Sequence, residues 1–347
     1  MVVIVDETGD RKKGKTTDYV ARQYLGSVGK IDQGIVSVNV YGVYEDVTIP
    51  LICRVFKPKG RLKPGDIYQT KPEIASEILE ELVDYGFEID LVLSDSLYGE
   101  SGHFIQTLER HGLSWVLSIR SNHGVFLPPG QRVRANRWCA FERHFRRKRP
   151  EKRYIREIIF GKRHRRTYWQ LTSDPENLPE QSTSFVMTNL PGAPRTLKQK
   201  LGDLYGLRTW VEYGFRQCKQ ELGWTNYRFT HIQSIEKWWE VIFCVYLMIS
   251  LNTDALKTCA SSEAKSMEEK EQEPGAEDDH PGNIHKQWSQ EGAWKSVLNN
   301  MRLLIQPTLM LCAISSWVSV FPNRRLWQGL GQLVRQVNHY HLHYWSG

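Results

Sequence analysis

The segment Ile89–Asp95, IDLVLSD, is an apolar run that ends in an aspartate. It follows Lys71–Phe87, where apolar side chains recur at helical spacing. A helix is predicted next over Gly102–His111, and then an apolar strand over Leu113–Ile119. Strands that alternate with helices in this way are typical of an α/β sheet with parallel neighbours. The pattern therefore predicts a buried strand with a carboxylate at its end.

Apolar runs upstream of this segment predict an antiparallel meander of strands. Val2–Val5 is directly followed by Asp6, and the later runs are Val20–Leu25, Ile35–Val43 and Val47–Phe56. The resulting order of strands, helix, strand, helix and strand matches a ribonuclease-H-like fold. We therefore predict the fold class α/β, with a mixed sheet flanked by helices.

The chain divides into five predicted parts. Residues 1–120 and 191–257 form the two halves of the core, 121–190 form a basic β-rich insertion that interrupts it, 258–285 form an acidic disordered linker, and 286–347 form a C-terminal helical segment. The apolar helix predicted over Ser234–Leu251 is expected to be buried.

Charge is distributed unevenly along the chain. The 347 residues carry a net charge of +7, but residues 261–279 hold eight acids against two lysines. Without that acidic stretch the remainder carries a charge of +13. Residues 132–166 hold fifteen Lys or Arg against three acids, a local charge of +12. A basic body of this kind predicts a polyanionic partner such as double-stranded DNA.

Composition excludes several classes of protein. No uninterrupted apolar run is long enough to span a bilayer, so we expect no membrane partner. The start, MVVIVDETGD, lacks the basic region and long apolar stretch of a signal peptide. Six cysteines are scattered without a CxxC pair, which excludes a zinc ribbon and indicates a reducing, cytoplasmic location.

Two apolar strands are followed by an aspartate, at Asp6 and Asp95. If these strands lie side by side and parallel, both carboxylates project from the same edge of the sheet. Together with a third carboxylate, these two can bind a pair of Mg²⁺ ions about 4 Å apart. Turn or capping acids are the alternative, because aspartates are common at strand ends.

The segment Leu204–Trp224, LYGLRTWVEYGFRQCKQELGW, lacks proline and is predicted to be largely helical. At about 100° per residue, one narrow stripe of that helix carries a carboxylate among phenol and cationic groups. These residues are Tyr205, Arg208, Glu212, Arg216 and Lys219. A metal-binding carboxylate beside phosphate-binding cations is the arrangement that phosphodiester cleavage needs. A solvated face with incidental ion pairs is the alternative.

The spacing Tyr-x2-Arg-x3-Glu-x6-Lys resembles the signature of bacterial insertion-sequence DDE transposases. The contexts VDETGDRKKGK, LSDSLYGES and SIEKWWE are similar to one subgroup, and the resemblance covers nearly all of 1–257. It implies that Asp6, Asp95 and Glu212 are the catalytic residues and bind two Mg²⁺ (or Mn²⁺) ions. Asp10 is the rival for the first position.

The resemblance also implies a reaction and its partners. Water attacks a phosphodiester to free a 3′-hydroxyl, which then attacks target DNA, with no covalent enzyme intermediate. Tyr205, Arg208 and Lys219 would contact transposon-end DNA, and a homodimer would hold paired ends at the bacterial nucleoid. Members of this group usually begin with a helical region that recognises terminal repeats. Because Met1 lies five residues before Asp6, a truncated copy or partial reading frame is expected.

Further basic side chains, in the stripe and outside it, are predicted to bind DNA phosphates without reading sequence. In the loop after the first strand they are Lys12, Lys13 and Lys15, on the helix Arg216, and in the insertion Arg146, Arg147, Arg149, Arg163 and Arg165. A disordered, solvated segment is the alternative for the insertion.

Three other functions remain open at this point. Gly9-x4-Gly14-Lys15-Thr16 satisfies the P-loop pattern of an NTPase, but its interior is charged and VARQYL after it is strand-like. The other two are an inactive or domesticated DNA-binding remnant and a ribonuclease-H-like nuclease that cleaves without strand transfer.

Overall fold

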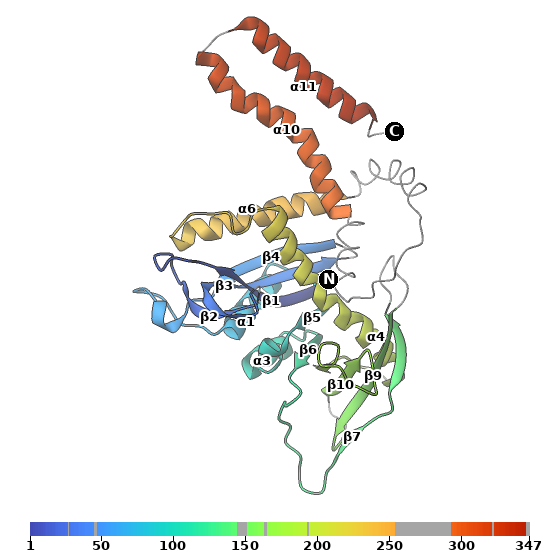
Figure 1. Ribbon diagram of the computed structural model, residues 1–347. Helices are drawn as coiled ribbons and strands as arrows, with labels where there is room; N and C mark the ends of the chain where they lie inside the picture. Colours follow the sequence, from blue (N-terminus) through green and yellow to red (C-terminus); the bar gives the residue numbers. More distant parts are fainter. Residues whose placement is uncertain are drawn as a thin grey trace. The chain divides into compact units, whose positions relative to one another are not determined.

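Eleven strands of the described residues join in one mixed sheet, in the order β2-β3-β1-β5-β6-β11-β10-β9-β7, with β4 paired to β3 and β8 to β9 (Figure 1). The computed structural model describes residues 1–26, 28–44, 47–143, 151–162, 165–192, 194–253, 293–320 and 323–344. The chain forms two compact units, Met1–Cys244 and Val245–Gly347. The α/β mixed sheet flanked by helices is as predicted.

The first half of the core contains four strands before its first long helix. The elements are β1 (Val2–Arg11), β2 (Ala21–Leu25), β3 (Lys30–Tyr44), β4 (Val47–Val55), the short 3₁₀ helix η1 (Lys59–Arg61), α1 (Lys71–Asp84), β5 (Leu91–Ser94), α2 (Ser96–Gly99), α3 (Gly102–Arg110) and β6 (Trp115–Ile119). Strands β1, β2 and β4 all pair antiparallel with β3, which confirms the antiparallel strands. The order differs from a simple meander, because β1 pairs with β3 and not with β2.

Strand β1 is longer than predicted. It pairs with β3 from Val2 through to Arg11, so Asp6 lies in the middle of a strand and not at its end. The parallel pairing of β1 with β5 stops earlier, at Val5 opposite Ser94. Asp6 is therefore the first β1 residue beyond the end of β5. The strand end predicted from the sequence exists on the β5 side of β1, whereas pairing continues on the β3 side.

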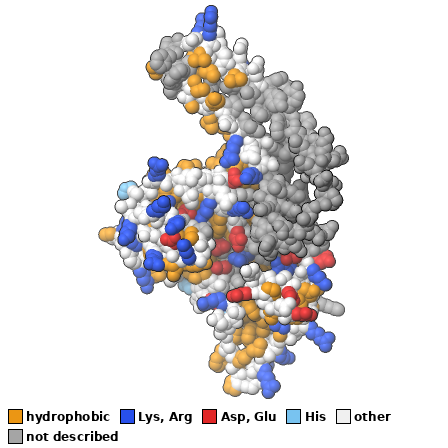
Figure 2. All heavy atoms as spheres, viewed as in Figure 1, with side chains coloured by type: hydrophobic (Ala, Val, Ile, Leu, Met, Phe, Trp, Pro, Cys, Tyr) orange, Lys and Arg blue, Asp and Glu red, His pale blue; other side chains and the backbone are white. Residues whose placement is uncertain are grey.

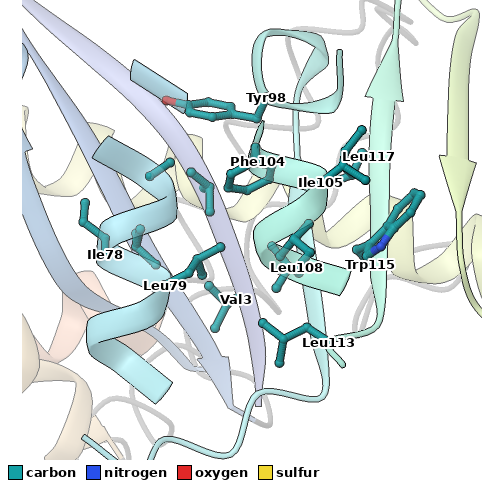
Figure 3. Close-up of a cluster of buried hydrophobic side chains, with 14 of the residues drawn as sticks. Val3, Ile78, Leu79, Tyr98, Phe104, Ile105, Leu108, Leu113, Trp115 and Leu117 are labelled. Atoms are coloured by element: carbon teal, nitrogen blue, oxygen red, sulfur yellow. The ribbon is translucent and has the colours of Figure 1, made fainter. Parts of the chain in front are cut away.

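The core lies between the sheet and the helices α1 and α3 (Figure 3). Ile78 and Leu79 of α1, Phe104 and Leu108 of α3 and Val3 of β1 are all at most 1% exposed. Burying one such side chain contributes about 1.5–3 kcal/mol, so this layer fixes β1 against β5. Helix α1 begins with a capping box in which Thr70 and Glu73 bond each other's backbone N–H groups.

The other face of β1 and β3 is covered by a second helical layer. Its elements are α4 (Pro194–Gly206), the 3₁₀ turn η2 (Leu207–Thr209), α5 (Trp210–Arg216), the π-helical segment η3 (Gln217–Glu221) and α6 (Ile232–Leu251). The Tyr41 ring of β3 packs edge-on against Phe215 and Phe243, at centroid distances of 5.4 and 5.9 Å. In α6, Val241 is 52% exposed, so the prediction of a buried helix is wrong for that face.

The predicted insertion, residues 121–190, is β-rich, as expected. It contributes β7 (Val133–Ala135), β8 (Cys139–Arg143), β9 (Glu151–Phe160), β10 (Thr167–Thr172) and β11 (Ser184–Thr188). Strand β11 pairs antiparallel with β6, so these strands extend the core sheet and do not form a separate one.

The second unit contains the end of α6 and two further helices, α10 (Ala293–Val320) and α11 (Arg324–Tyr344). They agree with the predicted C-terminal helical segment, whereas the predicted linker at 258–285 lies outside the described residues. No described helix combines the length and the apolar character needed to cross a bilayer.

Candidate active site

Three carboxylates converge where the parallel pairing of β1 and β5 ends. Asp6, Glu7 and Asp95 each offer an oxygen, and these oxygens lie within 4.8 Å of one another. Strand alternation directs adjacent side chains to opposite faces. Beyond Val5, however, no β5 residue is paired with β1, so the Glu7 carboxylate is able to approach the others at this edge.

The backbone around the cluster holds two of the carboxylates in place. Asp95 caps helix α2, and its Oδ1 accepts a hydrogen bond from the Leu97 N–H at 2.9 Å. The Glu7 N–H donates to Asp6 Oδ1 at 2.8 Å. Glu7 itself is paired with Lys71 at the start of α1, with Nζ 3.1 Å from Oε1.

Burial and mutual repulsion make Asp6 and Asp95 reluctant to ionise. The pKa of Asp6 is raised to about 7, mainly by burial, with Arg208 opposing the rise and Asp95 and Glu7 adding to it. The pKa of Asp95 is also raised, first by burial and then by Glu7. Carboxylates held together at such a cost are stabilised when a cation is present.

A cation of the protein lies beside the acids. Arg208, in the 3₁₀ turn η2, has a terminal nitrogen 3.9 Å from Asp6 Oδ2. Burial opposes its charge, but Tyr205 and the nearby carboxylates raise the pKa of Arg208. The guanidinium also lies over the Tyr205 ring, 6.0 Å from its centroid. The structure thus brings Tyr205 and Arg208 of the predicted stripe to the acidic cluster.

Lys219 of the stripe contacts a different acid. Its Nζ lies 2.9 Å from Asp10 Oδ1 and donates to the Gly9 carbonyl oxygen at 2.9 Å. The side chain of Asp10 is only 2% exposed. Asp10 is therefore part of a buried ion pair and lies outside the acidic cluster, which favours Asp6 over its rival. In this structure Lys219 joins the helical layer to β1.

Glu212 lies outside the three-carboxylate cluster in the described structure. It is exposed, in the first turn of α5, four residues after Arg208. The Glu212 carboxylate is among the groups that raise the pKa of Arg208, so Glu212 lies on the Arg208 side of this segment. Arg216 is exposed as well and donates to Gln220 Oε1 at 3.1 Å.

The predicted DNA contacts of the loop after β1 differ in exposure. Lys13 and Lys15 are exposed, whereas Lys12 is half-buried with Nζ 3.6 Å from the Tyr227 ring centroid. Burial lowers the pKa of Lys12 despite nearby Asp10. In the insertion Arg165 is exposed, and four predicted residues lie outside the described residues: Arg146, Arg147, Arg149 and Arg163.

The P-loop alternative does not agree with the fold. Gly9 to Arg11 belong to strand β1, and the residues after Thr16 lead into strand β2 without a helix. A P-loop requires a helix whose N-terminus faces the phosphate. The segment therefore matches the P-loop sequence pattern but does not have the P-loop structure.

Sequence reasoning missed Glu7 and Lys71. In a regular strand Glu7 points to the face opposite to Asp6, so the strand pattern alone does not bring the two carboxylates together. Lys71 is separated from it by 64 residues, and only the packing of α1 on the sheet brings the two together. The adjacent acids in the stretch VDETG were the one available signal.

The turn after Asp95 has room only for a glycine at position 99, so a substitution there tests how the turn positions Asp95. A Cβ atom at Gly99 would lie 2.0 Å from the Ser118 carbonyl oxygen. We expect Gly99→Ala to lower the free energy of unfolding by about 1–3 kcal/mol and to displace Asp95. Urea unfolding measures this, with Gly102→Ala as the control because nothing lies within 4 Å of its Cβ position. Equal stability of the two variants would contradict the prediction.

Residues 1–157 match the family model described as DDE superfamily endonuclease. This part of the chain is similar to DDE superfamily endonucleases. A probable transposase for insertion sequence element IS701, from Microchaete diplosiphon, is 52% identical to this chain over 238 residues. The aligned region covers 68% of this chain and 62% of that relative, so the chain spans less than two thirds of the relative's length.

Proposed function

We propose that this protein is an insertion-sequence transposase that cleaves DNA strands and joins them to target DNA. The observation that carries the proposal is the convergence of Asp6, Glu7 and Asp95 within 4.8 Å at the edge of a mixed sheet. Similarity to the probable IS701 transposase supports the same substrate class. The catalytic residues of the proposal are Asp6, Asp95 and Glu212.

The residues of the cluster fit a divalent cation. Asp6 and Asp95 supply the oxygen ligands that Mg²⁺ prefers, and Glu7 Oε2 is fully shielded from solvent beside them. The pKa values of both aspartates are raised, first by burial and then by neighbouring carboxylates, so a bound cation would favour their ionised forms. When bound, two Mg²⁺ (or Mn²⁺) ions would supply Lewis-acid activation of water and neutralise developing phosphate charge.

The helical layer supports a role for Glu212. Arg208 faces Asp6 and Lys219 faces Asp10, so the segment from 208 to 219 runs alongside β1. Eleven helical residues extend about 16 Å, close to the roughly 13 Å covered by four strand residues. Glu212 lies within that run, one turn beyond Arg208. A small movement of α5 on binding would complete the acidic triad.

The chain's own residues then have distinct tasks. Asp6 and Asp95 would hold the cations, Arg208 neutralises charge at Asp6, and the Tyr205 ring packs against the guanidinium. In the presence of DNA, Arg208 is placed to bind a phosphate next to the scissile bond. We further propose a homodimer on paired DNA ends, acting in the bacterial cytoplasm at the nucleoid.

A plasmid-nicking assay tests the proposal. With Mg²⁺ or Mn²⁺ the protein should nick supercoiled DNA, and Glu212→Gln should lower the rate by about 10²–10³-fold because a charged ligand is lost. Glu88→Gln, an exposed glutamate before β5, is the matched control and should be unchanged.

Two further outcomes would change the assignment. Joining of a pre-cut 3′-hydroxyl end to plasmid DNA distinguishes a transposase from a nuclease that only cleaves. DNA binding without nicking under either cation would instead support the inactive remnant.

A further inference from the structure

Two basic connections lie side by side in the first unit. The connection after β1 contains RKKGK at residues 11–15, and the one between β4 and α1 contains KPKGRLK at residues 57–63. The Arg61 guanidinium donates to the carbonyl oxygens of Lys15 at 2.9 Å and Thr17 at 3.3 Å. The two stretches lie more than forty residues apart in the chain and hold eight cations, of which Arg11, Lys57 and Lys63 pair with aspartates. Lys and Arg side chains gather over this part of the molecule in Figure 2.

The connections are held by their own ion pairs. Lys63 Nζ lies 2.6 Å from Asp18 Oδ2, and Lys57 Nζ lies 2.6 Å from Asp66 Oδ1. Asp18 also accepts from the Ile232 N–H at 2.9 Å, which fixes it to the start of α6. Since these acids engage Lys57 and Lys63, the exposed Lys13, Lys15 and Lys59 are presented on an ordered surface.

A chain of contacts leads from this surface to the acidic cluster. The Lys59 Nζ lies 4.6 Å from the Tyr68 ring centroid, and the Tyr68 and Phe56 rings are 6.4 Å apart. Phe56 in turn lies under Lys71, with 5.8 Å between Nζ and the ring centroid. Lys71 pairs with Glu7 of the cluster. The cations therefore begin beside the acids and continue away from them.

We propose that Lys13, Lys15, Lys59 and Arg61 form a seat for the phosphate backbone of duplex DNA, to one side of the scissile phosphate. Lys12, the residue just before the seat, lies six residues beyond Asp6, which corresponds to about 20 Å of extended chain. At 3.4 Å per base pair, the seat contacts phosphates about six base pairs from the cleavage point. Its charge and its Lys-rich composition suit non-specific backbone contact and not base reading. The inference rests on the proposed function for its ligand.

The salt dependence of DNA binding tests the seat. Affinity for a 24-base-pair duplex is measured by fluorescence anisotropy at several salt concentrations, with Ca²⁺ present in place of Mg²⁺. The slope of log K against log salt is negative, and each lost phosphate contact reduces its magnitude by about 0.9. The double variant Lys15→Gln/Lys59→Gln should therefore lower it by about 1.8. Arg61 is left intact because its guanidinium holds the two connections together.

A charge-matched pair serves as the control. Arg110→Gln/Arg324→Gln removes two exposed cations from α3 and α11 and should leave the slope within about 0.3 of the wild-type value. Equal slopes for the two double variants, or an unchanged slope for Lys15→Gln/Lys59→Gln, would overturn the proposal that these residues bind DNA phosphates. Nicking by Asp95→Asn is measured alongside. Retained nicking in that variant would overturn the proposed function while leaving the binding result intact.

Discussion

Asp95→Asn should lower the rate of Mg²⁺-dependent nicking by about 10³-fold. A metal site contributes several kcal/mol to charge stabilisation in the transition state, and about 4 kcal/mol corresponds to that factor. The asparagine keeps the size of the side chain and can still accept the 2.9 Å bond from the Leu97 N–H, so the cap of α2 is preserved. The change is therefore one of charge and not of fold.

Asp84→Asn is the matched control for this effect. Asp84 is the exposed last residue of α1, so the same substitution there should leave nicking unchanged. Circular dichroism of both variants checks the fold. Nicking by Asp95→Asn at more than a tenth of the wild-type rate would exclude the acidic cluster as the active site.

The second large effect is expected at the buried ion pair between Lys219 and Asp10. Lys219→Met removes the cation but leaves Asp10, whose side chain is 2% exposed, without its charged partner. Breaking one side of a buried pair costs about 3–5 kcal/mol, because an uncompensated charge remains buried. We expect the free energy of unfolding, measured by urea denaturation, to fall by that amount.

The partner substitution separates this structural role from DNA contact. Asp10→Asn/Lys219→Met removes both charges and should recover about half or more of the lost stability. If Lys219 served only to bind DNA phosphates, Lys219→Met would leave stability unchanged and weaken DNA binding alone. Arg216→Met, at an exposed position of α5, is the control for removing a cation from the same segment.

Local patterns predicted most elements of the core. The alternating run around Val36, Val38 and Val40 became β3, and the helical spacing of Ile74, Ile78 and Leu82 became α1. These predictions worked because periodicity and burial act on the same residues. Which strands are neighbours depends on contacts across the whole chain. The prediction that Asp6 and Asp95 share one sheet edge therefore depended on an assumed parallel pairing of β1 with β5. The structure confirms that pairing.

The helical stripe was predicted less well because its helix is not uniform. A 3₁₀ turn at Leu207–Thr209 and a π-helical segment at Gln217–Glu221 interrupt the α-helical rise on either side of α5. Each changes the angle per residue, so 100° steps do not carry from Tyr205 to Lys219. This explains why Arg208 and Lys219 meet different acids. The assignment of Glu212 to the triad stays a prediction.

The position of Asp6 within β1 determines which parts of the site can adapt. On both sides of Asp6 the ladder to β3 continues, from Val2 opposite Val43 to Arg11 opposite Gly34. The main chain of Asp6 is thus held by strand pairing on both sides along β1, whereas Glu212 lies on a short helix between a 3₁₀ turn and a π-helical segment. If Glu212 is a ligand, as proposed, reaction steps with different geometries would be accommodated by movement of α5, while Asp6 keeps its position in β1.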